Sequence, residues 1–303
     1  MNIRNVILGT VGVVLIALAS VLIPILGVML AGIPIILLLL REKGSIHESI
    51  LTLSVGVVIT YFIFGLFNAI FIGLYGMLTS LVLSYTYYKN MKALKSQLLI
   101  CGSVLLSFTI VLYLLNMGTD LHISEFFRES FLNSEDMIDS MGLLDNSDMD
   151  LNMVINQILT IIPFIMVLIS FVNSVVIYHG NRYIMQRNNL SVVEMDDFSD
   201  FKLPMHFIYG ITFILILSYL TGLTGMIDFS TISLNIILVL IYVFAFQGAA
   251  ILFYYLDKRN INNFVKGLIL ALLIIFQAMF ILSIVGWLDM IFDFRKIKSS
   301  EDE

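Results

Sequence analysis

The stretch TISLNIILVLIYVFAFQGAAILFYY, residues 231–255, has no charged side chain in 25 consecutive positions. A helix needs about 20 mainly apolar residues to cross the hydrocarbon core of a bilayer, so this stretch is long enough to span one. Backbone polar groups at that depth must form hydrogen bonds inside the protein, and an α-helix satisfies them within its own segment. The stretch therefore predicts a transmembrane α-helix.

The rest of the chain has the same character. Of its 303 residues, 59% are hydrophobic and 13% are charged, and the mean hydropathy is +1.00. Soluble domains average about 45–50% apolar and about 25% charged residues, because polar side chains must cover their surface. The composition predicts an all-α fold, a polytopic transmembrane helix bundle whose first partner is the lipid bilayer.

Nine segments are long and apolar enough to cross, which gives about nine spans (eight or nine): 6–23, 25–40, 47–64, 66–87, 97–116, 154–178, 205–222, 231–255 and 263–288. The segment 25–40 is short and carries Pro34, so a broken helix is the alternative there. The spans 47–64 and 66–87 form a close-coupled pair around Gly65.

The distribution of Lys and Arg predicts the orientation, because cytoplasmic loops carry an excess of both. With a cytoplasmic N-terminus, twelve basic residues fall inside: Arg4, Arg41, Lys43, Lys89, Lys92, Lys95, Arg182, Arg187, Lys202, Lys258, Arg259 and Lys266. Four fall outside: Arg128, Arg295, Lys296 and Lys298. Either the basic tail is a tolerated exception to the rule that Lys and Arg lie on the cytoplasmic side, or one early span is miscounted. We prefer the first explanation.

The spans predict one transmembrane domain over residues 1–296, followed by a short charged tail at 297–303. The longest break, 117–153, contains nine acidic residues and one basic residue. We expect it to form an acidic extracytoplasmic loop inserted into that domain.

Several functions are excluded by what the sequence lacks. A net charge of −6 argues against nucleic acid as a partner. No phosphate-binding glycine motif occurs, so an ATP-driven pump in a single chain is ruled out. The lone Cys101 and four scattered histidines predict no metal site, and nothing indicates a cofactor. Acidic and basic residues avoid the middle of the confident spans, so we expect no enzyme activity.

The spans do contain amides, which both donate and accept hydrogen bonds. A cavity lined by such groups suits an uncharged or zwitterionic solute, and we take Asn173, Asn235 and Gln247 as candidate binding residues. The alternative is hydrogen bonding between helices. Small residues at Gly27-x-x-x-Ala31, Gly65-x-x-x-Ala69 and Gly248-Ala249-Ala250 predict close helix packing.

The most distinctive string is GWLDMIFDFRK, residues 286–296. If it is helical, Asp289 and Asp293 lie four apart on one face and repel each other, a repulsion that Lys296 could relieve. Trp287 suits the headgroup region, so the string predicts an interfacial anchor that includes Asp293 and Arg295. In the alternative reading, Asp289 lies at the edge of a solute cavity.

Several short motifs are spread along the chain: Ile33-Pro34 with Arg41, Asn181-Arg182, Phe201-x-Leu203-Pro204, Asn235, Gln247-Gly248 and the closing Gly286-x-x-Asp289-x-x-x-Asp293-Phe294-Arg295-Lys296. In these residues the chain resembles the YybS-like family of bacterial multi-spanning membrane proteins over nearly its whole length. The resemblance implies a multi-pass protein of the bacterial cytoplasmic membrane. More distantly, the helical layout is similar to the substrate-binding subunits of energy-coupling-factor transporters and to the rod-shape protein MreD.

These observations predict a solute-binding or transport-type membrane subunit that takes a small neutral or zwitterionic molecule and works with partner subunits. The alternative is a non-catalytic cell-envelope scaffold that recruits other membrane or envelope proteins. An intramembrane enzyme is the weakest reading, because the spans lack paired ionisable groups.

Overall fold

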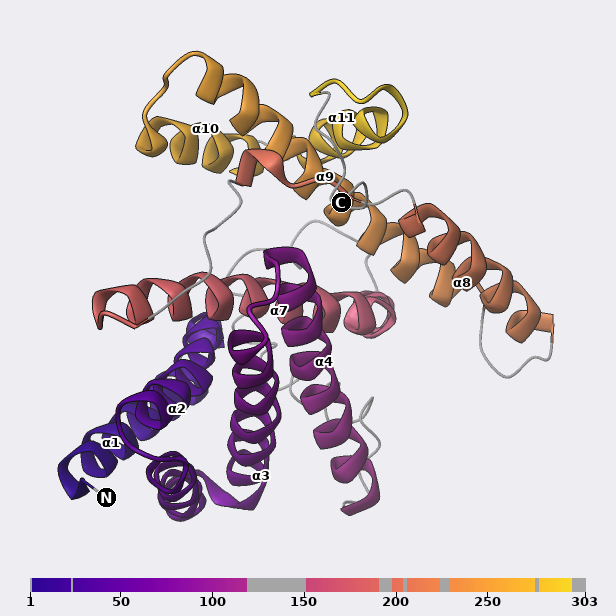
Figure 1. The fold of residues 1–303 in the computed structure, drawn as a ribbon. Coiled ribbons are helices and arrows are strands. Elements are labelled where there is room, and N and C mark those ends of the chain that lie inside the picture. Colours follow the sequence, from indigo (N-terminus) through magenta and orange to yellow (C-terminus); the bar gives the residue numbers. More distant parts are fainter. Residues whose placement is uncertain are drawn as a thin grey trace. The chain divides into compact units, whose positions relative to one another are not determined.

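A computed structural model describes residues 2–22, 24–118, 151–190, 198–203, 206–223, 229–275 and 278–295. Every regular element in these ranges is a helix (Figure 1), which confirms the predicted all-α fold. The chain forms two compact units, Met1–Glu194 and Met195–Glu303, and each is described by itself. The single domain expected over 1–296 stays a prediction.

Unit 1 consists of α1 (Ile3–Leu22), the 3-10 helix η1 (Pro24–Ala31), α2 (Gly32–Lys43), α3 (Ile46–Tyr88), α4 (Ala93–Gly118) and α7 (Leu151–Arg187). Unit 2 consists of η2 (Phe198–Asp200), α8 (His206–Leu223), α9 (Phe229–Lys258), α10 (Asn263–Ile275) and α11 (Met279–Phe292). Within the described residues, five helices are long and apolar enough to cross a membrane: α1, α3, α4, α7 and α9.

Helix α3 contains two spans, because Gly65 interrupts its helical geometry with φ +83° and ψ 176°. A positive φ is accessible to glycine and costly for other residues, so this position turns the chain. The close-coupled pair 47–64 and 66–87 is thereby confirmed. The packing role expected of Gly65 was wrong, because a β-carbon there would meet no atom within 4 Å, and the same is true of Gly27.

The short segment 25–40 is divided, as the broken-helix alternative expected. Its first part is the 3-10 helix η1, and α2 begins at Gly32. Pro34 is the third residue of α2, in the first turn, where a missing backbone N–H breaks no helical hydrogen bond. Its buried neighbours Ile33 and Leu37 belong to the core of unit 1, which also includes Ile72 and Tyr75 of α3.

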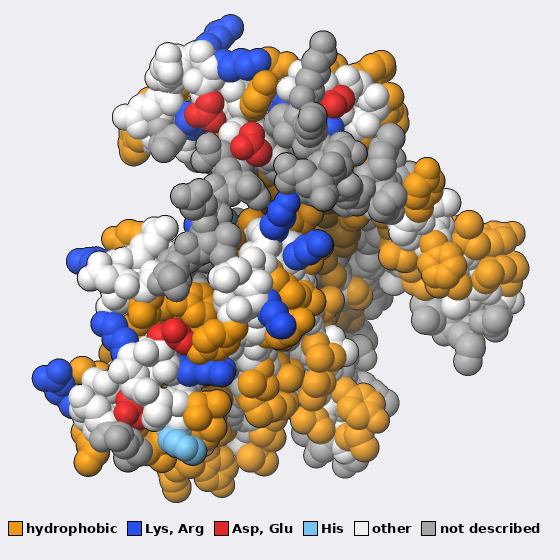
Figure 2. All heavy atoms as spheres, in the orientation of Figure 1, with side chains coloured by type: hydrophobic (Ala, Val, Ile, Leu, Met, Phe, Trp, Pro, Cys, Tyr) orange, Lys and Arg blue, Asp and Glu red, His pale blue; other side chains and the backbone are white. Residues whose placement is uncertain are grey.

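Large apolar side chains also cover the outside of the helices. Phe62 is 79% exposed, and Leu66 and Tyr113 are exposed as well. In Figure 2, hydrophobic side chains cover much of the visible surface, while Lys and Arg appear as separate side chains among them. A water-soluble protein rarely exposes so much contiguous apolar area. Lipid contact explains the surface, as expected for a membrane protein.

In unit 2, helices α9 and α11 pack against each other through glycine. A β-carbon on Gly286 would lie 2.0 Å from the Phe244 carbonyl oxygen, and one on Gly248 would lie 2.0 Å from the Leu282 carbonyl oxygen. The two backbones are therefore in direct contact, which confirms the close packing predicted at Gly248. Helix α8 also packs on α9.

The segment 263–288, expected to be one span, is divided between α10 and α11. These helices of 13 and 14 residues are each about 20 Å long, shorter than the roughly 30 Å hydrocarbon core. Phe244 of α9 lies against Gly286 of α11 and Gln247 against Asp289, so the second half of α11 packs on the middle of α9.

This geometry corrects the predicted placement of Arg295. The Tyr254 hydroxyl donates a hydrogen bond to the Arg295 carbonyl oxygen over 3.3 Å, which puts the end of the described chain at the same end of α9 as Lys258. The sequence reading placed Arg295 opposite Lys258, because it counted 263–288 as a full crossing. Basic residues at one end of α9 agree with the distribution of positive charge.

Two predicted regions lie largely outside the described residues. Helix α4 ends at Gly118 and α7 begins at Leu151, so most of the acidic loop 117–153 is not described. The tail 297–303, Lys296 and Gln277 are also outside.

Candidate functional site

The candidate site lies where α11 ends. Asp293 adopts a left-handed conformation (φ 44°, ψ 59°), and its N–H donates to the Asp289 carbonyl oxygen at 2.9 Å. A left-handed residue just after a helix is a common C-terminal cap. It reverses the chain, so that Arg295 folds back beside Asp289 of the same helix.

Asp289 and Arg295 form an ion pair whose two side chains are completely buried. Nη2 and Nε of Arg295 donate to the Asp289 Oδ2 atom over 2.8 and 3.2 Å. Gln247 of α9 adds a third donor, its Nε2 at 3.1 Å from the same oxygen. Buried charges are tolerated when they are paired and hydrogen-bonded, and this pair meets both conditions.

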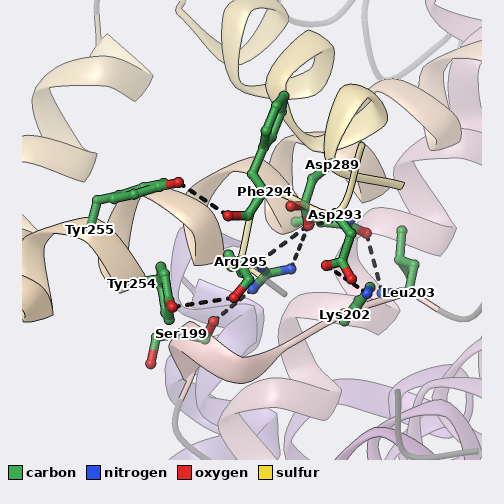
Figure 3. A network of polar contacts seen from close by, with 10 residues as sticks. Ser199, Lys202, Leu203, Tyr254, Tyr255, Asp289, Asp293, Phe294 and Arg295 are labelled. Atoms are coloured by element: carbon green, nitrogen blue, oxygen red, sulfur yellow. Dashed lines mark hydrogen bonds and ion pairs between the residues drawn. The ribbon is translucent and has the colours of Figure 1, made fainter. Parts of the chain in front are cut away.

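The same network holds the segment 198–203 against α9 and α11 (Figure 3). Arg295 Nη1 donates to the Ser199 carbonyl oxygen at 2.6 Å, and the Leu203 N–H donates to Gln247 Oε1 at 3.2 Å. At the periphery, Lys202 forms an ion pair with Asp293 at 2.8 Å. Three chain segments thus meet on one buried charge pair.

One acceptor atom of the network has no hydrogen-bond donor among the described residues. Asp289 Oδ1 is buried and accepts no hydrogen bond from the described residues, although Oδ2 accepts three. A buried carboxylate oxygen without a donor is costly, so such atoms require an explanation. Chemically, Oδ1 can accept a hydrogen bond from an N–H or O–H group of a bound molecule.

The structure brings two of the four candidate binding residues together, Gln247 and Asp289. Asn235 lies earlier on α9, where its Nδ2 donates to the Thr231 carbonyl oxygen at 2.8 Å. Asn173 belongs to unit 1 and accepts a hydrogen bond from the Tyr75 hydroxyl at 3.3 Å, with both residues buried. Whether these residues bind a solute stays a prediction.

The residues of the closing string differ from the expected interfacial anchor. Arg295 neutralises Asp289, and Asp293 pairs with Lys202, while the relief expected from Lys296 lies outside the described residues. Arg295 is buried within unit 2, and its interfacial depth stays a prediction. Trp287 is 47% exposed on α11, which fits a ring in contact with lipid.

Sequence reasoning missed the Asp289–Arg295 pair. It treated residues 286–296 as one continuous helix, on which Asp289 and Arg295 are six apart and face different directions. The left-handed turn at Asp293 is what brings them together. Aspartate is one of the few residue types that tolerate this conformation, so Asp293 was itself the available signal.

The geometry defines a class, a multi-pass α-helical membrane protein with a buried charge pair in its C-terminal part. The chain belongs to the family described as "Predicted membrane protein (DUF2232)", whose model matches residues 11–290. No curated protein and no solved structure matches the chain.

Proposed function

We propose that the protein is a solute-binding, transport-type membrane subunit, and that its solute reaches the network around Gln247 and Asp289. The observation that supports this is the buried Asp289 Oδ1, an acceptor with no donor. Helices that only had to pack together would not need to retain a carboxylate in that state.

The charge of the site suggests the class of solute. Arg295 already balances Asp289, so the buried pair has no net charge to offer an ion. A molecule that donates an N–H or O–H group to Oδ1 gains a charge-assisted hydrogen bond without bringing an unbalanced charge. We therefore propose a small neutral or zwitterionic molecule.

We also propose which partners the protein works with and in which membrane it lies. The chain carries no phosphate-binding glycine motif, so partner subunits in the membrane would supply the energy. We propose the bacterial cytoplasmic membrane as the location, with kinship to the YybS-like proteins, on the residues quoted above. We propose no catalytic activity, because Asp289 and Arg295 are committed to each other.

Native mass spectrometry of gently solubilised full-length protein tests this function. We expect a co-purified small molecule on the wild type, and weaker retention after Gln247→Ala, which removes one of the three donors that orient Asp289. We also expect weaker retention after Asn235→Ala. The control is Asn68→Ala, which removes an amide of unit 1 that likewise bonds a carbonyl one turn back, Phe64 at 3.0 Å. Unchanged retention in Gln247→Ala and Asn235→Ala would refute the solute site.

A scaffold is the second candidate, and the contact between α9 and α11 favours it. Gln247 is completely buried between these helices and also binds the Leu203 N–H, as an amide in interhelical packing does. A scaffold would retain no small molecule in the same experiment and would instead carry a bound membrane or envelope protein.

A further inference from the structure

Unit 1 gathers basic residues at one end of its helices. Arg41 stacks over the ring of Tyr88 with 4.7 Å to its centroid, so the end of α2 meets the end of the second half of α3. Lys43 donates a hydrogen bond to Asn188, just beyond the end of α7. The turn between α3 and α4 adds the exposed Lys89 and Lys92, and the first turn of α4 adds the exposed Lys95. The end therefore attracts anions.

Within this end, Arg182 of α7 is only 5% exposed, yet it has no carboxylate partner among the described residues. Its Nη1 donates to the Tyr178 hydroxyl at 3.2 Å, and its guanidinium lies 5.8 Å from the centre of the same ring. Its Nε is buried and has no hydrogen-bond acceptor in the part of the chain that the structure describes. An arginine is always charged, so burial without a counter-ion is costly.

Arg182 and its neighbour Asn181 line a cavity of about 30 Å³ between α7 and the turn from α3 to α4. Asn181 is 4% exposed, and no described residue donates a hydrogen bond to its buried Oδ1. The cavity is completed by Leu83, Thr86, Tyr87, Asn90, Met91, Ser96 and Tyr178. Ser96 is in the first turn of α4, where the helix dipole also favours an anion.

We propose that this cavity binds a phosphate oxyanion. Arg182 would donate from Nε to one phosphate oxygen, and Asn181 Oδ1 would accept from a hydroxyl group of the same ligand, a P–OH of inorganic phosphate or a glycerol hydroxyl of a phosphatidylglycerol headgroup. Such a ligand supplies both the missing acceptor and the missing donor, together with the missing counter-charge. The site is separate from the network around Asp289 and does not depend on the proposed function.

The size of the cavity limits what it can hold. A cavity of roughly 10–15 Å³ can hold one water molecule. At about 30 Å³, this cavity has room for one phosphate group. The rest of a larger molecule must extend outside. Two sources share this chemistry, a soluble phosphate and the headgroup of an anionic phospholipid, and the experiment below distinguishes them.

The test uses the full-length protein and follows its thermal unfolding midpoint. In the first arm, inorganic phosphate is titrated against chloride at constant ionic strength, in nanodiscs of phosphatidylcholine. In the second arm, discs of phosphatidylglycerol replace phosphatidylcholine without added phosphate. A ligand that binds only the folded state raises the midpoint in a saturable way. We expect such a rise in at least one arm, and the arm identifies the source.

Arg182→Gln is expected to weaken the response about tenfold or more, since it removes a charge-assisted hydrogen bond. The control is Arg187→Gln on the same helix, where an exposed arginine is lost with the same change in net charge. Should Arg182→Gln not fold, Arg182→Lys keeps the charge but lacks Nε, and we expect weaker binding there too. The proposal fails if the wild type responds in neither arm, if Arg187→Gln loses as much as Arg182→Gln, or if Arg182→Lys binds as the wild type does.

Discussion

Replacement of Gly286 by leucine is expected to prevent the stable packing of α9 against α11. Even the first side-chain carbon would lie 2.0 Å from the Phe244 carbonyl oxygen and 2.8 Å from the Gly248 nitrogen. Both are backbone atoms, so neither can rotate away, and the helices must separate. Overpacked sites commonly lose about 1–3 kcal/mol, and a backbone clash exceeds that range. Loss of monodisperse protein, or a large fall in the unfolding midpoint in detergent, would show the effect.

The matched control is Gly267→Leu in α10, where a β-carbon would meet no atom within 4 Å. The glycine there is exposed, so the substitution adds the same side chain without a clash. We expect Gly267→Leu to purify as the wild type does. Equal tolerance of both substitutions would show that α9 and α11 are not in backbone contact.

Asp289→Asn should be the second most damaging change, with a loss of about 3–5 kcal/mol in the free energy of unfolding. Asparagine has nearly the same shape, but it leaves the completely buried Arg295 without a counter-charge. Arg295→Leu should have a similar cost, because Asp289 is then the unpaired charge. The free energy of unfolding in detergent provides the measurement.

Two comparisons make this prediction specific. Asp293→Asn removes the same charge four residues away, but its ion pair with Lys202 is partly exposed and should contribute about 0–1 kcal/mol. The double variant Asp289→Leu with Arg295→Leu removes both buried charges and should recover much of the loss of either single variant. Additive losses in the double variant would mean that the two residues do not form a pair.

Much of the fold could be predicted from the sequence, because a lipid environment restricts what each segment can be. Long apolar runs such as 231–255 had to be helices, and the break at Gly65 was visible as a short gap between two runs. The segment 263–288 was misread, because continuous apolar sequence does not reveal that one helix ends at Ile275 and another begins at Met279. Hydropathy measures how far a run extends and not whether it forms one helix or two.

The candidate site was less accessible to sequence reasoning. Gln247 and Asp289 were singled out as polar groups, but nothing in their spacing indicated that they touch, since α9 and α11 are separated by another helix. Asn173 was grouped with them by residue type alone, and the structure pairs it with Tyr75 of unit 1. Arg182 was counted as a loop residue, because the run of apolar residues ends at Tyr178 while helix α7 continues to Arg187.

The central claim is that the helices cross a bilayer with their basic ends on one side, and α4 offers the most direct measurement. In a background with Cys101→Ser, single cysteines at Lys92, just before α4, and at Met117, near its end, are reacted with an impermeant maleimide on sealed cells. We predict that Met117→Cys reacts from outside, and that Lys92→Cys reacts only after the membrane is opened. Reaction of both positions on sealed cells, or the reverse pattern, would contradict the account.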